Sequence, residues 1–300
     1  MIKPQILNSM SKRQEPTTFA GIYSIKQIRN IPCSCCGRTM TTTFEIKNAA
    51  NLFSEMRKKE LSAFMQRYKT HFKGPQKRIL SLIQKFSKEW KSLNIREILE
   101  KILCAQQGVA PSIILTPEEL KYLQKILRHL EYKKLSLSLF SPSLITIDHI
   151  KPQKNQGASD FHNYILMCQD CNGSKKATPF AVFMYHFPDL ILNIKKHIKA
   201  LRIVQKTSPT IQVKNYITKY LPALKERLRT ELQDFLPNNL LEKYLDFLFL
   251  PNSGIEKKEI KNQILTEFEK QKIKLEQLEL EWTPQKYIPP KKCKTKHTQS

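Results

Sequence analysis

The chain predicts an α+β fold that is mostly helical and contains one small two-stranded core. Long stretches place apolar residues three and four apart, as in NAANLFSEMRKKELSAFMQRY and PEELKYLQKILRHLEY, which is typical of amphipathic helices. One stretch differs: SPSLITIDHI and NYILMC are short, apolar and β-branched, and a polar loop separates them. We therefore expect two strands joined by a long loop, with a helical insertion before them and a helical domain after them.

Changes in composition divide the chain into six parts. Prolines at 188, 209, 237 and 251 break the C-terminal helical pattern, and the last eighteen residues are polar, basic and typical of a disordered tail. The expected parts are an N-terminal segment (1–30), a first cysteine knuckle (31–44), a helical basic insertion (45–140), the core with a second knuckle (141–187), a helical basic domain (188–282) and the tail (283–300).

Charge and hydropathy restrict the class of protein. The 51 basic and 26 acidic residues give a formal charge of +25, which favours a polyanionic partner such as nucleic acid. Basic residues gather in 57–91 and 195–229, together with Tyr68, Tyr216 and Tyr220, and such helices can flank a duplex; the alternative is a solvated surface. No apolar run reaches the ~20 residues of a membrane span and no secretory signal is present, so we expect a cytoplasmic protein without membrane contact.

Two cysteine pairs indicate a metal site. Cys33 and Cys36 are separated by two residues, as are Cys168 and Cys171, and a glycine follows each pair closely. A two-residue gap lets both thiolates of a turn reach one ion at ~2.3 Å, so the two knuckles predict a structural zinc with four sulfur ligands. Cys35 is an alternative ligand to either neighbour. A closed four-sulfur site holds structure, so catalytic groups must lie elsewhere.

Polar residues with side chains suited to catalysis flank the two short apolar runs. Asp148 and His149 end the first run, thirteen residues separate His149 from Asn163, and eight separate Asn163 from Asn172; Lys175 follows three positions later. Aspartate and asparagine supply the hard oxygen ligands that Mg²⁺ prefers, and a histidine with a pKa near ~6.5 suits a base at neutral pH. Cleavage of a phosphodiester needs such a base, a cation and donors to the phosphate.

The motif D-H, N, C-x-x-C-N and K resembles the HNH endonuclease family, in the variant with Asn in place of the final His and with the motif between zinc-binding cysteine pairs. The resemblance implies a zinc-stapled ββα-metal core. It implies His149 as general base, Asp148 and Asn172 as ligands of a catalytic divalent cation such as Mg²⁺, Asn163 as the residue that orients His149, and Lys175 as a phosphate contact. The implied reaction leaves 5′-phosphate and 3′-hydroxyl ends on double-stranded DNA.

Competing interpretations remain at this level. His162 beside Asn163 is a rival ligand or base, although it is out of register with the motif. A zinc-ribbon protein that binds nucleic acid or protein without cutting it, and an enzyme that processes RNA, would also fit a basic chain with these knuckles. Neighbours on an ideal strand point to opposite faces, so Asp148 and His149 share a site only if the strand ends there.

Overall fold

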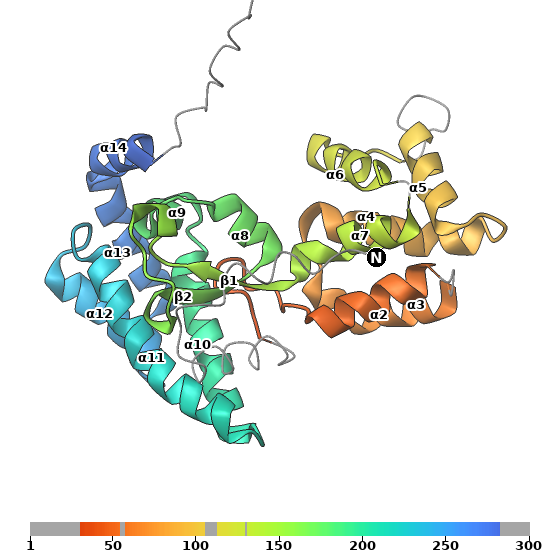
Figure 1. The fold of residues 1–300 in the computed structure, drawn as a ribbon. Coiled ribbons are helices and arrows are strands. Elements are labelled where there is room, and N and C mark those ends of the chain that lie inside the picture. Colours follow the sequence, from red (N-terminus) through yellow and green to blue (C-terminus); the bar gives the residue numbers. More distant parts are fainter. Residues whose placement is uncertain (1–30, 55–57, 106–112, 130, 283–300) are drawn as a thin grey trace, which may run out of the picture.

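The computed structural model describes residues 31–54, 58–105, 113–129 and 131–282. The expected N-terminal segment (1–30) and basic tail (283–300) lie outside these ranges. The chain forms two lobes, one built from helices α2 to α7 and the other from the strand pair with helices α8 to α14 (Figure 1).

The first lobe is helical and has its own apolar core, drawn from buried residues between Ile46 and Phe140. Its helices are α2 (Thr43–Ser54), α3 (Lys58–Arg67), α4 (Gly74–Glu89), α5 (Ile95–Cys104), α6 (Pro117–Leu127) and α7 (Tyr132–Phe140). Capping boxes start two of them, Asn94 with Glu97 on α5 and Thr116 with Glu119 on α6. Local sequence signals therefore set the start of these two helices.

The second lobe contains the two strands, β1 (Ile145–His149) and β2 (Tyr164–Cys168). They are antiparallel, and Asp148 lies opposite Ile165 while His149 lies opposite Tyr164. The helices that follow in the described residues are α8 (Gln169–Lys175), α9 (Phe180–His186), α10 (Leu190–Thr207), α11 (Ile211–Leu232), α12 (Asn238–Phe249), α13 (Lys257–Lys270) and α14 (Lys272–Trp282). The α+β, mostly helical prediction is confirmed.

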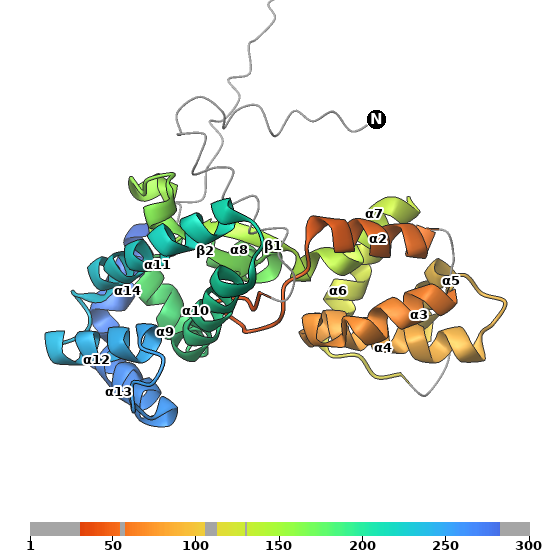
Figure 2. The ribbon, with the colours of Figure 1, turned by 90° about the horizontal axis from the view of Figure 1, so that it is seen from below.

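The chain leaves and rejoins the second lobe at neighbouring points. Thr41 N–H donates to the Ser143 carbonyl at 2.8 Å, and Ile145 N–H donates to the Thr41 carbonyl at 2.9 Å. The helices between these points form the separate lobe seen on the right of Figure 2. The first cysteine knuckle thus lies against the strand pair despite the 131 residues that separate Cys36 from Cys168.

The tyrosines expected among the basic residues belong to the interior. Tyr68, Tyr216 and Tyr220 are all buried, and the Tyr220 hydroxyl donates to the Tyr164 carbonyl at 2.9 Å. Their rings pack in the interior, so any contact of these helices with a duplex would come from other side chains. None of the described helices combines the length and apolar character needed to cross a membrane.

Candidate nuclease site

Asp148 and His149 occupy the last two positions of β1, where the strand ends. The next backbone amide, Ile150 N–H, donates to the Asn163 carbonyl at 2.8 Å and starts the loop. Because the strand stops here, both side chains line one cleft of about 630 Å³, together with residues of α8 and the loop. The structure thus brings the two adjacent residues to a common site.

The Asp148 carboxylate is buried, and one of its two oxygen atoms accepts a hydrogen bond. Oδ1 accepts a hydrogen bond from the His149 amide at 2.8 Å, whereas Oδ2 is buried without a hydrogen-bond partner among the described residues and lies 3.4 Å from Lys175 Nζ. Burial raises the pKa of this carboxyl, although the Lys175 ammonium and the His149 amide favour its charged form. A second cation at Oδ2 would complete the coordination of an oxygen that pairs with Lys175 but accepts no hydrogen bond among the described residues.

The His149 ring stands beside Asp148, with its edge toward Tyr164 at a centroid distance of 5.0 Å. Nε2 is buried and has no hydrogen-bond partner in the described part of the chain. Burial lowers the pKa of His149, and the Lys175 ammonium lowers it further, while Asp160 acts in the opposite direction. The imidazole is therefore held in its neutral form, which is the form that can accept a proton.

Asn163 holds the loop that follows His149. Its Oδ1 accepts from the Lys151 amide at 2.8 Å, and its Nδ2 donates to the carbonyls of Lys151 and Ala158 at 2.8 and 2.9 Å. The side chain is buried and contacts neither Asp148 nor His149 through a hydrogen bond. Asn163 thus braces the backbone two residues after His149, and any effect on the imidazole is indirect.

Gly157 is a further constraint on this loop that the sequence analysis missed. A Cβ at this position would lie 2.0 Å from the Lys151 carbonyl oxygen, the same atom that accepts from Asn163. Only glycine lets the two backbone segments approach so closely. A single glycine in a polar loop looks like an ordinary turn residue, so sequence alone offered no signal.

We expect Gly157→Ala to lower the free energy of unfolding by about 1–3 kcal/mol and to reduce activity, because the loop behind His149 must shift. Gly173→Ala is the matched control, since a Cβ there meets nothing within 4 Å and the position is helical. The control is expected to be neutral or stabilising by about 0.4–1 kcal/mol. Denaturant unfolding of both variants makes the comparison; equal stabilities would contradict the close approach.

Asn172 lies on α8, next to β1. Its Nδ2 donates to Thr146 Oγ1 at 3.0 Å and to the Ile147 carbonyl at 3.2 Å. With the amide nitrogen used in this way, Oδ1 is the atom that remains to bind a cation. The side chain is therefore fixed by β1, the same strand that carries Asp148.

Lys175 occupies a different environment from the one expected. The residue is wholly buried, and its ammonium donates to the His149 carbonyl at 2.7 Å and lies 3.4 Å from Asp148 Oδ2. Burial lowers the pKa of this lysine, and Asp148 raises it. The ammonium therefore binds the end of β1 through the His149 carbonyl and the Asp148 carboxylate. A phosphate contact by Lys175 remains a prediction.

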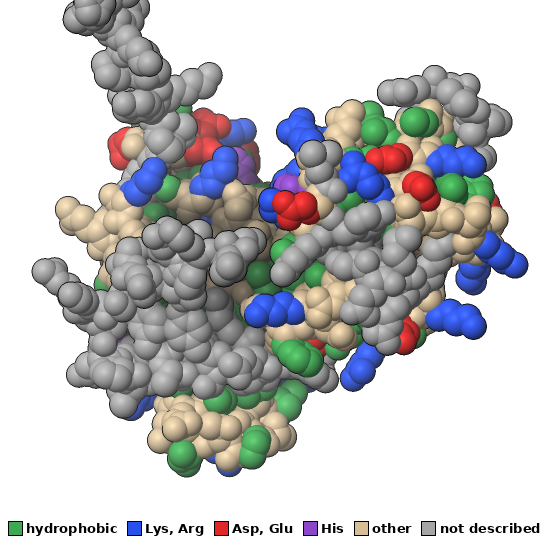
Figure 3. Space-filling view, turned by 45° about the vertical axis from the view of Figure 1, so that its right-hand side comes forward, with side chains coloured by type: hydrophobic (Ala, Val, Ile, Leu, Met, Phe, Trp, Pro, Cys, Tyr) green, Lys and Arg blue, Asp and Glu red, His purple; other side chains and the backbone are tan. Residues whose placement is uncertain are grey.

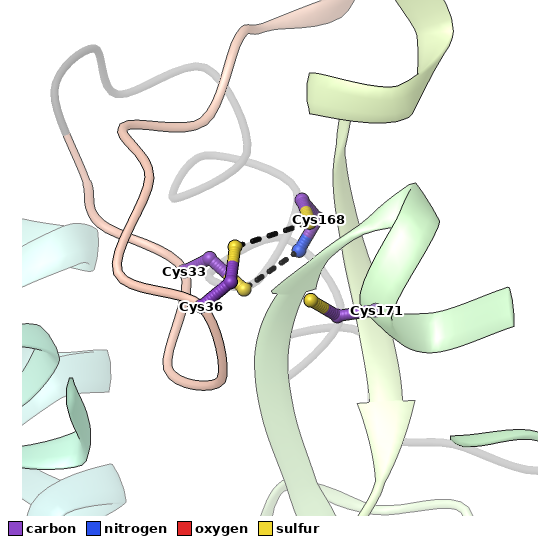
Figure 4. A group of neighbouring side chains, drawn as sticks. All are labelled: Cys33, Cys36, Cys168 and Cys171. Carbon is purple, nitrogen blue, oxygen red and sulfur yellow. Dashed lines mark hydrogen bonds between the residues drawn. The ribbon is translucent and has the colours of Figure 1, made fainter. Parts of the chain in front are cut away.

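The four paired cysteines form one cluster (Figure 4). The sulfur atoms of Cys33, Cys36, Cys168 and Cys171 all lie within 4.8 Å of one another, and Cys36 Sγ is 3.9 Å from Cys168 Sγ. A tetrahedral zinc with ~2.3 Å bonds places its sulfur ligands ~3.8 Å apart, so the cluster has the dimensions of such a site. Cys35 is buried but outside this group.

Contacts from distant elements hold the first knuckle in place. Gly37 has φ +68°, and a Cβ there would lie 2.6 Å from Asn193 Oδ1, while Asn193 Nδ2 donates to the Cys35 carbonyl at 2.6 Å. Arg38 donates to Asp170 at 3.1 Å, between the two cysteines of the second knuckle, and to Gln76 of α4 at 3.3 Å. The knuckle therefore contacts α10, α8 and the helical lobe at once.

The rival candidate His162 does not line the cleft. Its side chain is exposed, and its backbone amide donates to Asp160 Oδ1 at 2.9 Å, which caps a short helical turn. Glu279 of α14, by contrast, lines the cleft opposite the strand end and pairs with His186 at 2.9 Å. It lies 130 residues beyond His149, and no motif relates the two.

Comparison with protein families identifies this region. The family model described as HNH endonuclease matches residues 134–178. Residues 134–178 are therefore similar to the HNH endonuclease family. No curated protein and no solved structure gives a match. The HNH match spans both strands, α8 and the second knuckle, whereas Cys33 and Cys36 come from outside it and complete the four-sulfur group.

Two oxygen atoms within residues 134–178 are chemically suited to a divalent cation, and of the two residues Asp148 lines the cleft. Asp148 Oδ2 is a buried carboxylate oxygen without a hydrogen bond, and Asn172 Oδ1 belongs to an amide whose nitrogen is fixed on β1. Both are hard oxygen donors, and Mg²⁺ commonly uses one or two such protein ligands and completes its shell with water and phosphate.

Proposed function

We propose that the protein is a metal-dependent endonuclease of the HNH type that hydrolyses phosphodiester bonds in double-stranded DNA. One observation carries the proposal. Asp148 and His149 line the same cleft, and each has a buried polar atom, Oδ2 and Nε2 respectively, that makes no hydrogen bond with the described residues. Burying such atoms is costly unless a ligand or solvent completes them. The match to the HNH family and the net charge of +25 support a nucleic-acid substrate.

The neutral His149 imidazole is the general base of this reaction. We assign proton uptake from water to the His149 ring, whose Nε2 has no hydrogen-bond partner among the described residues. The activated water attacks phosphorus, the bond from phosphorus to the 3′ oxygen breaks, and the departing 3′ oxygen takes a proton from solvent, which leaves a 5′-phosphate and a 3′-hydroxyl. Asp148 and Asn172 hold the divalent cation, which when bound offsets the charge on the phosphate and the departing oxygen.

The remaining motif residues position this base. Asn163 and Gly157 set the path of the loop after His149, and Lys175 fixes the His149 carbonyl from the opposite side. Such support limits the movement of the imidazole relative to Asp148. The four cysteines hold a structural zinc, a use of paired cysteines that is typical of reducing compartments such as the cytoplasm.

The test is cleavage of supercoiled plasmid by the wild type, with and without Mg²⁺. We expect nicked or linear products with Mg²⁺ and none in EDTA. His149→Ala is expected to lower the rate at least ~100-fold, the lower range for loss of a general base, while retaining the wild-type unfolding curve. His162→Ala is the matched control and should cut at the wild-type rate.

Two results would overturn the proposal. Equal cleavage by the wild type and His149→Ala would assign the activity to a contaminant, and no cleavage with Mg²⁺, Mn²⁺ or Zn²⁺ would leave the non-catalytic zinc-ribbon binder. A parallel assay on RNA of the same sequence separates the substrates, because cleavage of RNA alone would replace DNA as the substrate.

A further inference from the structure

A second hollow lies between α10, the end of α12 and the start of α13. It measures about 680 Å³ and shares no lining residue with the cleft of Asp148 and His149. Its floor is apolar and includes Phe247, Leu248 and Leu250. We call this hollow the α10 groove.

All charged residues that line the α10 groove are basic. They are Lys195, Lys196, Lys199, Arg202, Lys206 and Lys257. On the face of the α2–α7 lobe that Figure 3 shows, by contrast, basic side chains are dispersed and acidic ones lie among them. The groove is therefore a local concentration of positive charge.

Three of these cations have partners in or beside the groove. Lys195 Nζ lies 4.1 Å from the centroid of the Phe247 ring, the Arg202 guanidinium donates to the Phe249 carbonyl, and Lys196 Nζ donates to Asn193 at 2.9 Å. None of these contacts is an ion pair with a carboxylate. Burial lowers the pKa of Lys195, and repulsion by Lys257 adds to this effect. An anion between them would relieve that repulsion.

The spacing along α10 suits an extended polyanion. Lys195, Lys199, Arg202 and Lys206 recur at intervals of four, three and four residues, which places them on one helical face. Eleven residues at ~1.5 Å each span ~16.5 Å. One nucleic-acid strand carries a charge per ~3.4 Å of helix axis, so this row matches about five phosphates.

From these observations we propose that the α10 groove binds the sugar-phosphate backbone of a nucleic-acid strand outside the catalytic cleft. The inference rests on the proposed action on nucleic acid and adds a second contact to it. The apolar floor suits sugar rings and base faces, whereas a membrane surface would require a protruding apolar face in place of a concave one. Phosphates along one strand would then be held while another part of the same molecule lies in the cleft.

The test measures binding of a fluorescein-labelled 40-base-pair duplex in EDTA, with His149→Ala as the parent so that no cutting occurs. Lys199→Gln/Lys206→Gln neutralises two exposed groove lysines. We expect affinity to fall about tenfold near 0.15 M salt, and the slope of log K against log salt to decrease by about 1.4–1.8, for two lost phosphate contacts. Lys121→Gln/Lys125→Gln removes two equally exposed lysines from one face of α6 and should bind as the parent does.

Three outcomes would overturn the groove site. These are equal losses in both double variants, unchanged binding in the groove variant, and displacement of the duplex from the groove by millimolar inorganic phosphate, which would indicate a small-anion site. Tighter binding of the parent to phosphatidylserine vesicles than to the duplex, lost in the groove variant, would assign the groove to a membrane.

A cleavage assay separates this inference from the proposed nuclease. With His149 intact, the groove variant should still cut a short duplex that fills only the cleft at the wild-type rate, and should cut the long duplex more slowly. If the wild type cuts neither duplex, the nuclease fails while the binding measurements above still decide the groove.

Discussion

Removing zinc from the four-cysteine cluster is expected to unfold the strand pair and destroy the nuclease site. The cluster joins the end of β2 to a knuckle 131 residues earlier in the chain, so the metal closes a long loop. Structural zinc sites contribute on the order of 10 kcal/mol or more, which is comparable with the whole stability of a domain. Cys171→Ser, or a strong chelator, should therefore abolish the unfolding transition of the second lobe.

The measurement is zinc content by mass spectrometry together with thermal unfolding followed by circular dichroism. We expect one zinc per chain in the wild type and less than a tenth of that in Cys171→Ser. Part of the helical signal should persist, because α2 to α7 have their own apolar core. Cys104→Ser, at an exposed position on α5, is the control. A wild type without zinc, or a Cys171→Ser variant of unchanged stability, would contradict the metal site.

The same measurement decides the position of Cys35. It is buried, and its carbonyl accepts from Asn193, so it contributes its backbone to the knuckle. Cys35→Ser is expected to keep its zinc, whereas Cys33→Ser and Cys36→Ser should lose it. The sequence favoured Cys33 with Cys36, although three cysteines in four positions offer three ways to form a pair. The turn geometry around Gly37 favours the outer two.

Sequence patterns located the strands, the cysteine cluster and the end of β1 because each depends on short-range chemistry. A two-residue gap between cysteines indicates a metal knuckle, and short alternating apolar runs indicate a strand, whatever packs around them. Neighbouring residues on a strand point to opposite faces, so placing Asp148 and His149 in one site required the strand to end there. These predictions needed no knowledge of what packs around the motif.

The features that sequence could not supply depend on contacts between distant segments. Gly157 is required because Lys151 folds back over it, and Glu279 reaches the cleft only because α14 packs beside α9. The environment of Lys175 is a similar case: the family resemblance implied a phosphate contact and gave no sign of burial, whereas packing buries the ammonium against the end of β1. Burial of a charged side chain is a property of the assembled lobe.

Replacing Lys175 by methionine is the second change with a large expected effect. The variant keeps most of the side-chain volume but removes the donor to the His149 carbonyl and the cation 3.4 Å from Asp148 Oδ2. Loss of one partner of a buried ion pair leaves the other charge without compensation, at a cost of about 3–5 kcal/mol. We expect the free energy of unfolding at pH 7 to fall by about this amount.

The pH dependence of this loss has a definite sign. Burial already raises the pKa of Asp148, and removal of the ammonium raises it further. A carboxyl whose pKa is higher in the folded than in the unfolded protein takes up a proton on folding at low pH, so stability increases as pH falls through the raised pKa. The difference between Lys175→Met and the wild type should therefore narrow as the pH is lowered from 7 toward 5, as measured by urea unfolding at each pH.

The double variant Lys175→Met/Asp148→Asn separates the two possible roles of the lysine. Removing both charges should recover much of the lost stability, because neither buried charge is then left alone, while activity stays absent for want of the Asp148 carboxylate. If Lys175 instead bound a phosphate, Lys175→Met would unfold like the wild type and show a raised KM. Wild-type stability of Lys175→Met would thus support a phosphate contact by Lys175. A loss of stability that the double variant recovers would support a structural ion pair with Asp148.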